Sequence, residues 1–316
     1  MIGRSIRAGW SAAIGEKKLV AVVWFCNLAL SLAAGWGVWH WFGAAFNTAP
    51  EGDKLLDGFN LPVIVELFQY DRFSPYAAMT GAVTGLSIAA LLLGPAIAGG
   101  IYEVLASRDG RPVLHRFGRG AGHFYGRFLR LTVIALVVGL VLAGITSAIL
   151  GVLVRAIDDA GWERTWVAGR FGSMAVTLLV FLIAIVALDL ARARVVVEDR
   201  RGMLRTYLRA FRFVLANSGQ LFVIYASITL SFAIVGAVVM WIADAVPGRP
   251  WAGIVMVTLL QQVMMIVRAG FRVARAGASL EFAAAVPDRA VQRREVAAVQ
   301  PETERAPVAP ADAPTL

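Results

Sequence analysis

Residues 131–154 read LTVIALVVGLVLAGITSAILGVLV, and no charged side chain interrupts them. About 20 helical residues cross roughly 30 Å of hydrocarbon, so this run can span a membrane. The whole chain has a matching composition, because 59% of its 316 residues are hydrophobic and only 16% are charged. An average soluble domain is about 45–50% apolar and about 25% charged. Lipid must therefore cover the apolar surface that a soluble fold of this length could not bury. This excludes a cytosolic globular enzyme, a disordered chain and a disulfide-stapled secreted domain.

Five further apolar runs have the length of a membrane span. Because lipid offers no hydrogen-bond partner to an open backbone, each run must be a helix, and the fold class is all-α. The six predicted spans are residues 19–42, 79–106, 131–154, 171–191, 221–243 and 251–273. We expect residues 1–285 to form one six-span membrane domain. Residues 286–316 are rich in Pro and Ala, and we expect them to be a disordered cytoplasmic tail.

Lys and Arg are distributed unevenly between the two sides of these spans. Of the 30 Lys and Arg residues, 24 fall on the side that holds both termini. The positive-inside rule then predicts that the N- and C-termini are cytoplasmic. The chain has 27 Arg against 3 Lys and abundant Ala, a bias typical of a GC-rich bacterial gene, and it carries no organelle signal. The sequence thus predicts a multi-pass protein of a bacterial cytoplasmic (inner) membrane.

A basic segment precedes the first, third and fifth spans. In each segment, apolar residues recur at the spacing of one helix face, with arginines beside or opposite that face. We therefore expect three hairpins of two spans, each preceded by a basic amphipathic helix in the headgroup region. A basic juxtamembrane segment can also look amphipathic without belonging to such a repeat. The candidate lipid-headgroup contacts are Arg116, Arg119, Arg127, Arg201, Arg205, Arg209 and Arg212.

The net charge of +9 needs no nucleic acid to explain it. Anionic headgroups attract each basic residue near a membrane surface by about 1 kcal/mol. We therefore expect anionic membrane lipid to be the partner and exclude nucleic acid.

Four ionisable residues fall inside or at the ends of the spans: Glu103, Asp189, Arg192 and Arg268. Such residues are costly in lipid and are often functional. Counting along the spans places them near the cytoplasmic ends, and Asp189 and Arg192 are three residues apart, so they can pair on one helix face. One interpretation is that these groups pair or snorkel for structural reasons. The other is a cytoplasm-facing polar pocket between hairpins.

Two stretches of small residues predict close helix packing. Gly81 and Gly85 form one small-residue face in the second span, and Ala143, Ser147 and Gly151 form another in the third. Small residues at this spacing let the backbones of membrane helices approach each other.

No set of residues indicates catalysis or metal binding. The three histidines, His40, His115 and His123, are scattered, and no Cys/His cluster has the spacing of a metal site. The glycines of residues 118–122 resemble a phosphate-binding loop, but they follow no predicted strand. We therefore expect no catalytic residue, no metal and no cofactor.

Two stretches before the fifth span carry a resemblance to known proteins: DRRGMLR at residues 199–205 and YLRAFRFV at residues 207–214. The arrangement resembles the six-span membrane domain attached to some bacterial glycerophosphoryl diester phosphodiesterases, and related uncharacterised bacterial membrane families. The resemblance implies a membrane module without the phosphodiesterase's catalytic domain, so no catalytic residue carries over.

Two functions follow as hypotheses. The first is a non-enzymatic accessory or scaffold protein whose basic helices engage anionic lipid. The alternative is a small-solute or lipid transporter that uses a cytoplasm-facing polar pocket near Glu103, Asp189 and Arg268.

Overall fold

The computed structural model describes residues 2–46, 75–107, 109–158, 163–199, 202–244 and 250–285, which form helices and no strand. Arg201 and the predicted tail, residues 286–316, lie outside this part of the chain. Within these ranges there are eight helices: α1 (Ile2–Gly15), α2 (Lys17–Phe46), α5 (Pro75–Ala106), α6 (Val113–Asp158), α7 (Glu163–Glu198), α8 (Met203–Ala216), α9 (Ser218–Asp244) and α10 (Pro250–Ala285).

Six of these helices, α2, α5, α6, α7, α9 and α10, are long and apolar enough to cross a membrane. Each one contains a predicted span, so an all-helical chain with six membrane-length helices is confirmed. Large apolar side chains cover their outer surfaces, such as Leu140 and Ile149 on α6 and Phe171 and Met174 on α7, which are 58% or more exposed. Surfaces of this kind are stable in hydrocarbon, and the chain is a multi-pass membrane protein.

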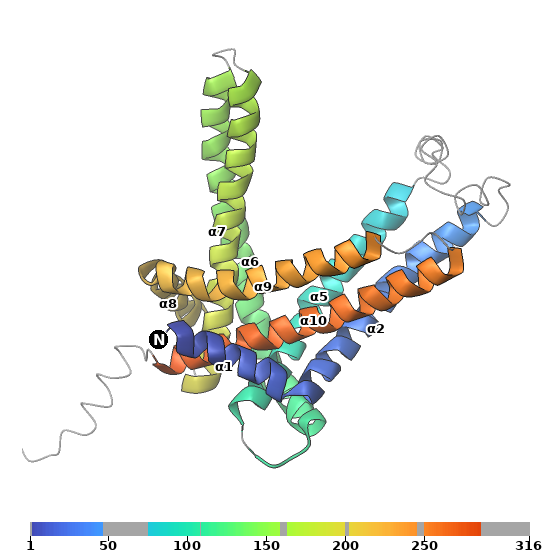
Figure 1. Cartoon of the computed structure of the whole chain (residues 1–316). Helices are drawn as coiled ribbons and strands as arrows, with labels where there is room; N and C mark the ends of the chain where they lie inside the picture. Colours follow the sequence, from blue (N-terminus) through green and yellow to red (C-terminus); the bar gives the residue numbers. More distant parts are fainter. Residues whose placement is uncertain are drawn as a thin grey trace, which may run out of the picture.

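The buried core lies at one end of the molecule, where the first turns of α2, α6 and α9 and the last turns of α5, α7 and α10 pack together with α8 (Figure 1). We call this the basic end, because most of the described arginines lie on it. From there α6 and α7 run side by side in one direction, while α2, α5, α9 and α10 leave in another (Figure 1). Lipid tails are as apolar as leucine, so nothing forces the far halves of the helices together. Protein packing therefore concentrates at the basic end.

The segment before the third span is not a separate helix. Helix α6 runs without interruption from Val113 to Asp158, so it contains both the basic segment and the span. The first turns of α6 contain several glycines, and each glycine in a helix costs about 1 kcal/mol relative to alanine. One of these glycines, Gly120, allows α6 to approach α5 closely. A Cβ at Gly99 would lie 2.7 Å from the carbonyl oxygen of Gly120, and one at Gly120 would collide with the Cβ of Glu103. Packing on α5 thus stabilises a helix that its own glycines weaken.

The segment before the first span forms its own helix, and that helix packs on the C-terminal part of α10. A Cβ at Gly9 of α1 would lie 2.5 Å from the carbonyl oxygen of Ala274. The rings of Trp10 and Phe271 meet edge to face, with centroids 5.1 Å apart. Arg4 forms an ion pair with Glu281 at 2.7 Å. The apolar side of α1 therefore contacts α10, where the sequence suggested headgroups.

The segment before the fifth span is α8, which packs on α7 through Tyr207, Ala210 and Val214. The Tyr207 hydroxyl donates to the carbonyl oxygen of Ala184 at 3.3 Å. Burial raises the pKa of Tyr207 to about 12, so the hydroxyl keeps its proton at neutral pH. The apolar residues predicted to share one face of this helix do not all lie in the core. Tyr207 and Val214 are buried, whereas Leu204 and Leu208 are exposed.

Candidate functional site

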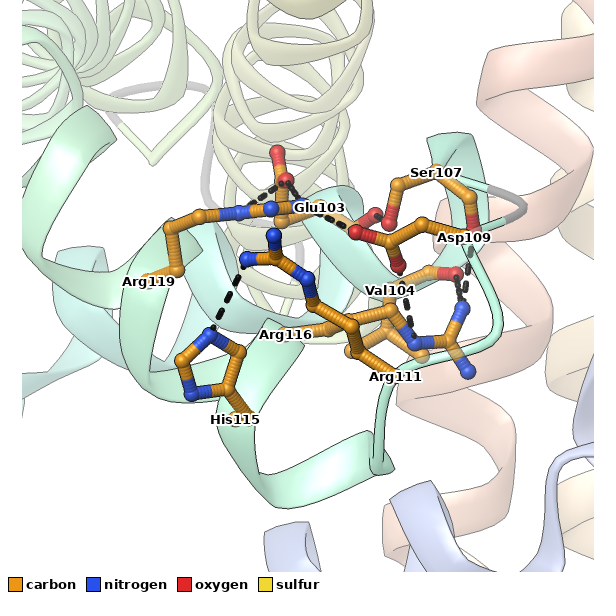
Figure 2. A network of polar contacts seen from close by, with 8 residues as sticks. All are labelled: Glu103, Val104, Ser107, Asp109, Arg111, His115, Arg116 and Arg119. Atoms are coloured by element: carbon orange, nitrogen blue, oxygen red, sulfur yellow. Dashed lines mark hydrogen bonds and ion pairs between the residues drawn. The ribbon is translucent and has the colours of Figure 1, made fainter.

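The structure separates the sequence-predicted polar residues into two places, and Glu103 belongs to the first. Its carboxylate accepts from Arg119 Nε at 3.0 Å and from Arg119 Nη2 at 2.5 Å (Figure 2). The same Nη2 lies 3.1 Å from Asp109 Oδ2. These three side chains join the end of α5, the connection that follows it and the first turns of α6. Glu103 therefore has a structural role in this turn and lies apart from Asp189.

Arg116 completes this network from inside the turn. Its Nη1 donates to the carbonyl oxygens of Val104 at 3.2 Å and Ser107 at 2.8 Å, which lie at the end of α5 (Figure 2). Carbonyl groups in the last turn of a helix have no partner within the helix, so this guanidinium satisfies two of them. Arg116 is 9% exposed. The prediction that it contacts lipid headgroups is therefore replaced by a capping role inside the protein.

Arg116→Ala is expected to lower the free energy of unfolding by about 2 kcal/mol, because hydrogen bonds to charged groups are each worth roughly 1.5–3 kcal/mol. The matched control is Arg111→Ala, since Arg111 is exposed and lies 3.4 Å from His115 Nε2. We expect the control to change stability by less than about 0.5 kcal/mol. Unfolding in detergent by titration with sodium dodecyl sulfate measures both, and equal effects would contradict the capping role.

Apart from Arg201, which lies outside the described residues, the remaining candidate headgroup contacts lie on the surface of the basic end. Arg127 on α6 forms an ion pair with Asp199, the residue after α7, which has a positive φ of 43°. Arg205, Arg209 and Arg212 are exposed on α8. This helix thus exposes basic side chains together with Leu204 and Leu208.

The second place is a partly open cavity of about 730 Å³ between helices. Helices α2, α5, α7, α9 and α10 all line it. Its wall includes four arginines and one carboxylate: Arg192, Arg268, Arg272, Arg275 and Asp189. Among the described lining residues, the charged side chains come from α7 and α10. The opposite wall is mostly apolar, with Asn27 and Ser31 as polar residues of α2.

Asp189 and Arg192 form the ion pair that their spacing predicts, with 3.6 Å between Oδ1 and Nη1. Arg192 also donates through Nη2 to Thr132 Oγ1 of α6 at 2.8 Å. Its Nε is buried and has no hydrogen-bond partner in the described part of the chain. The Tyr225 hydroxyl lies 3.5 Å from Asp189 Oδ2. The carboxylate that the described residues contribute to the wall is therefore already engaged, and these residues leave an excess of positive charge in the cavity.

Two buried hydroxyl groups, one of them on the cavity wall, hold the charged helices together. The Tyr102 hydroxyl of α5 donates to the backbone carbonyl of Asp189 at 3.0 Å and lies 3.0 Å from Ser279 Oγ of α10. Ser279 Oγ is also 2.9 Å from the carbonyl oxygen of Ala276, to which it donates. Helices α5, α7 and α10 thus meet at one side chain, which keeps the arginines of α7 and α10 on the same side.

Sequence reasoning found Asp189, Arg192 and Arg268 but missed Arg272 and Arg275. Those two lie at or beyond the predicted end of the sixth span, residue 273, and were counted as cytoplasmic charge. In the structure α10 continues to Ala285, so the three arginines of α10 are four and three residues apart on one helix face. Arg272 lies within electrostatic range of Arg192, Arg268 and Arg275. The 268, 272, 275 spacing was the signal that could have identified this face.

The described residues contain no group of three or more His, Cys, Asp or Glu side chains that could hold a metal ion. Among the described residues that line the cavity, the titratable groups are the four arginines, Asp189 and Tyr102. Arginine does not give up its proton in proteins. What this arrangement offers is a set of fixed cations that can bind a negatively charged group.

Comparisons of the chain with protein-family models, with curated proteins and with solved structures found no match. The resemblance to phosphodiesterase membrane domains therefore stays a prediction from the sequence.

Proposed function

We propose that this chain is a non-enzymatic accessory protein of a bacterial cytoplasmic membrane, and that it binds the phosphate-bearing headgroup of an anionic lipid in the arginine-lined cavity. In this proposal both termini are cytoplasmic, and the pairs α2–α5, α6–α7 and α9–α10 cross the membrane as three hairpins. Helices α1 and α8 then lie at the cytoplasmic surface. The distribution of Lys and Arg supports this orientation.

One observation carries the proposal: four guanidinium groups face one carboxylate in a cavity among membrane-spanning helices. An uncompensated charge away from water is costly unless an opposite charge pairs with it. Arginine suits phosphate in particular, because its planar fork of donors matches two phosphate oxygens at once. An anionic headgroup would neutralise the excess positive charge of the cavity wall.

The test compares the cavity with the basic surface of α8. The cavity variant replaces Arg268, Arg272 and Arg275 by Gln, and the surface variant replaces Arg205, Arg209 and Arg212 by Gln. We expect the cavity variant to retain at least about 10-fold less dioleoyl phosphatidate, because a single lost charge-assisted hydrogen bond of about 1.5 kcal/mol already corresponds to a factor of ten. The surface variant should retain nearly as much as the unmodified protein.

Native mass spectrometry of the detergent-purified protein counts the bound lipid, with dioleoyl phosphatidylcholine as the zwitterionic comparison. The single variant Arg268→Gln is measured as well, because Arg268 is exposed and its replacement should not disturb folding even if the triple variant misfolds. Equal retention of the two lipids by the unmodified protein would refute the proposal. Loss of phosphatidate from the surface variant alone would place the lipid on α8.

A transporter remains the second candidate, because Asp189, Arg192 and Arg268, three of the four residues predicted for a polar pocket, do line one cavity. In this case Asp189→Asn should abolish anion flux into proteoliposomes. The accessory role predicts that no flux depends on Asp189.

A further inference from the structure

A second hollow adjoins the cavity. It is a groove of about 320 Å³ between α2 and α5, and Leu30 and Leu86 line both the groove and the cavity. The groove extends from these two residues past Gly85 toward Gly37 on α2 and Gly81 on α5. The two hollows are thus neighbours, one with charged walls and the other with none.

The wall of the groove is made of small residues, and the sequence suggested a different use for them. Gly81 and Gly85 were expected to bring two helices into contact. A Cβ at Gly37, Gly81 or Gly85 would meet no atom within 4 Å, so no neighbouring helix fills this face in the described structure. The close approaches occur elsewhere, at Gly99 with Gly120 and at Gly9 with Ala274. The small side chains here leave space at the depth of the lipid tails.

We propose that the groove holds a hydrocarbon chain of the same anionic lipid whose headgroup occupies the cavity. This inference rests on the proposed function and adds a second binding surface, which would recognise the acyl chain of that lipid. Charge complementarity selects the headgroup at the arginines. The residues shared by both hollows place the start of the chain at Leu30 and Leu86.

The position of the groove also agrees with the way that a lipid stands in a membrane. Starting from the arginine end, the groove follows α2 toward its C-terminus and α5 toward its N-terminus, away from the basic end. A lipid of the leaflet on the basic side has its headgroup at that surface and its chains directed to the bilayer centre. No ionisable side chain lines the groove in the described part of the chain. An acyl chain therefore fits it without desolvating a charge.

The test fills the groove without disturbing the protein. Gly85→Leu adds a side chain where the Cβ has free space, so we expect the variant to fold normally. Gly144→Leu is the matched control, because Gly144 is exposed on α6, its Cβ also meets nothing within 4 Å, and it lines neither hollow. Native mass spectrometry should show about 10-fold less bound dioleoyl phosphatidate for Gly85→Leu, and no change for Gly144→Leu. Binding of glycerol 3-phosphate, which has a similar headgroup and no chain, should be the same in all three proteins.

A second measurement locates the chain directly. Phosphatidate carrying a photoreactive diazirine in its acyl chain should cross-link to residues 30–37 of α2 and 81–89 of α5. The adduct should disappear with Arg272→Gln, because the headgroup then loses its site. Cross-links spread along α6 and α7 instead, or phosphatidate binding that Gly85→Leu leaves unchanged, would overturn the inference while the cavity proposal stands.

Two other experimental outcomes separate a failure of the groove inference from a failure of the proposed function. If Gly85→Leu changes the oligomeric state and leaves phosphatidate binding intact, the groove is a docking face for a second copy, and the inference is wrong. If the unmodified protein binds neither phosphatidate nor glycerol 3-phosphate, the proposed function itself fails.

Discussion

Asp189→Asn is expected to lower the free energy of unfolding of the lipid-free protein by about 3 kcal/mol, the largest effect of any single substitution considered. Asp189 is the one carboxylate on the described wall of a cavity with four arginines, and it pairs with Arg192. Removing one partner of a buried ion pair typically costs roughly 3–5 kcal/mol, because the other charge stays buried and unpaired. The backbone carbonyl of residue 189 still accepts from Tyr102, so the helix contacts remain.

The same substitution should strengthen lipid binding. With the carboxylate gone, the headgroup becomes the main counter-charge, so phosphatidate should raise the melting temperature of Asp189→Asn more than that of the unmodified protein. The control is Asp199→Asn, because Asp199 is 71% exposed and pairs with Arg127 at the surface. Exposed ion pairs contribute about 0–1 kcal/mol. Equal stabilisation of all three proteins by phosphatidate would show that the cavity charge is not what binds the lipid.

Gly120→Ala is expected to destabilise the protein by about 1–3 kcal/mol, the usual cost of overpacking. The added methyl group would collide with Glu103 and would lie 2.7 Å from the carbonyl oxygen of Gly99, and a backbone atom cannot move aside cheaply. The collision also displaces Glu103 from Arg119, which weakens the turn between α5 and α6.

Gly118 and Gly122 provide matched controls on the same helix. A Cβ at either position meets nothing within 4 Å, and both residues are exposed. Alanine is favoured over glycine in a helix by about 1 kcal/mol, so both substitutions to Ala should raise stability. Titration with sodium dodecyl sulfate in detergent measures all three. If Gly120→Ala were also stabilising, the close contact of α5 with α6 would be wrong.

The polar residues show why the candidate site was only partly predictable. Glu103 and Tyr102 are adjacent in sequence, and neighbouring positions on an α-helix point about 100° apart, since 3.6 residues make one turn. Tyr102 faces α7 and α10, whereas Glu103 faces Arg119 of α6. Membrane depth alone grouped Glu103 with Asp189. Which way each one points depends on where the neighbouring helices lie.

The length of α10 was also not predictable from the sequence, because it depends on contacts with a distant helix. Residues beyond 273 include Arg275 and Glu281, and a polar segment after an apolar run ordinarily marks the end of a span. The helix continues because Ala274, Ala278 and Phe282 are buried at the basic end, with Ala274 against Gly9 of α1. That contact joins the two ends of the described chain, so a local pattern could not show it.

The amino-acid order was sufficient to establish six apolar helices, because backbone hydrogen bonding and apolar length act locally and the lipid solvent leaves no alternative. The spacing of three residues between Asp189 and Arg192 in the sequence also predicted their ion pair. Contacts between distant helices decided the rest. They placed Arg116 under the end of α5, left Gly81 and Gly85 facing an open groove, and brought the arginines of α7 and α10 to one cavity, since small residues and charges acquire their partners only through packing.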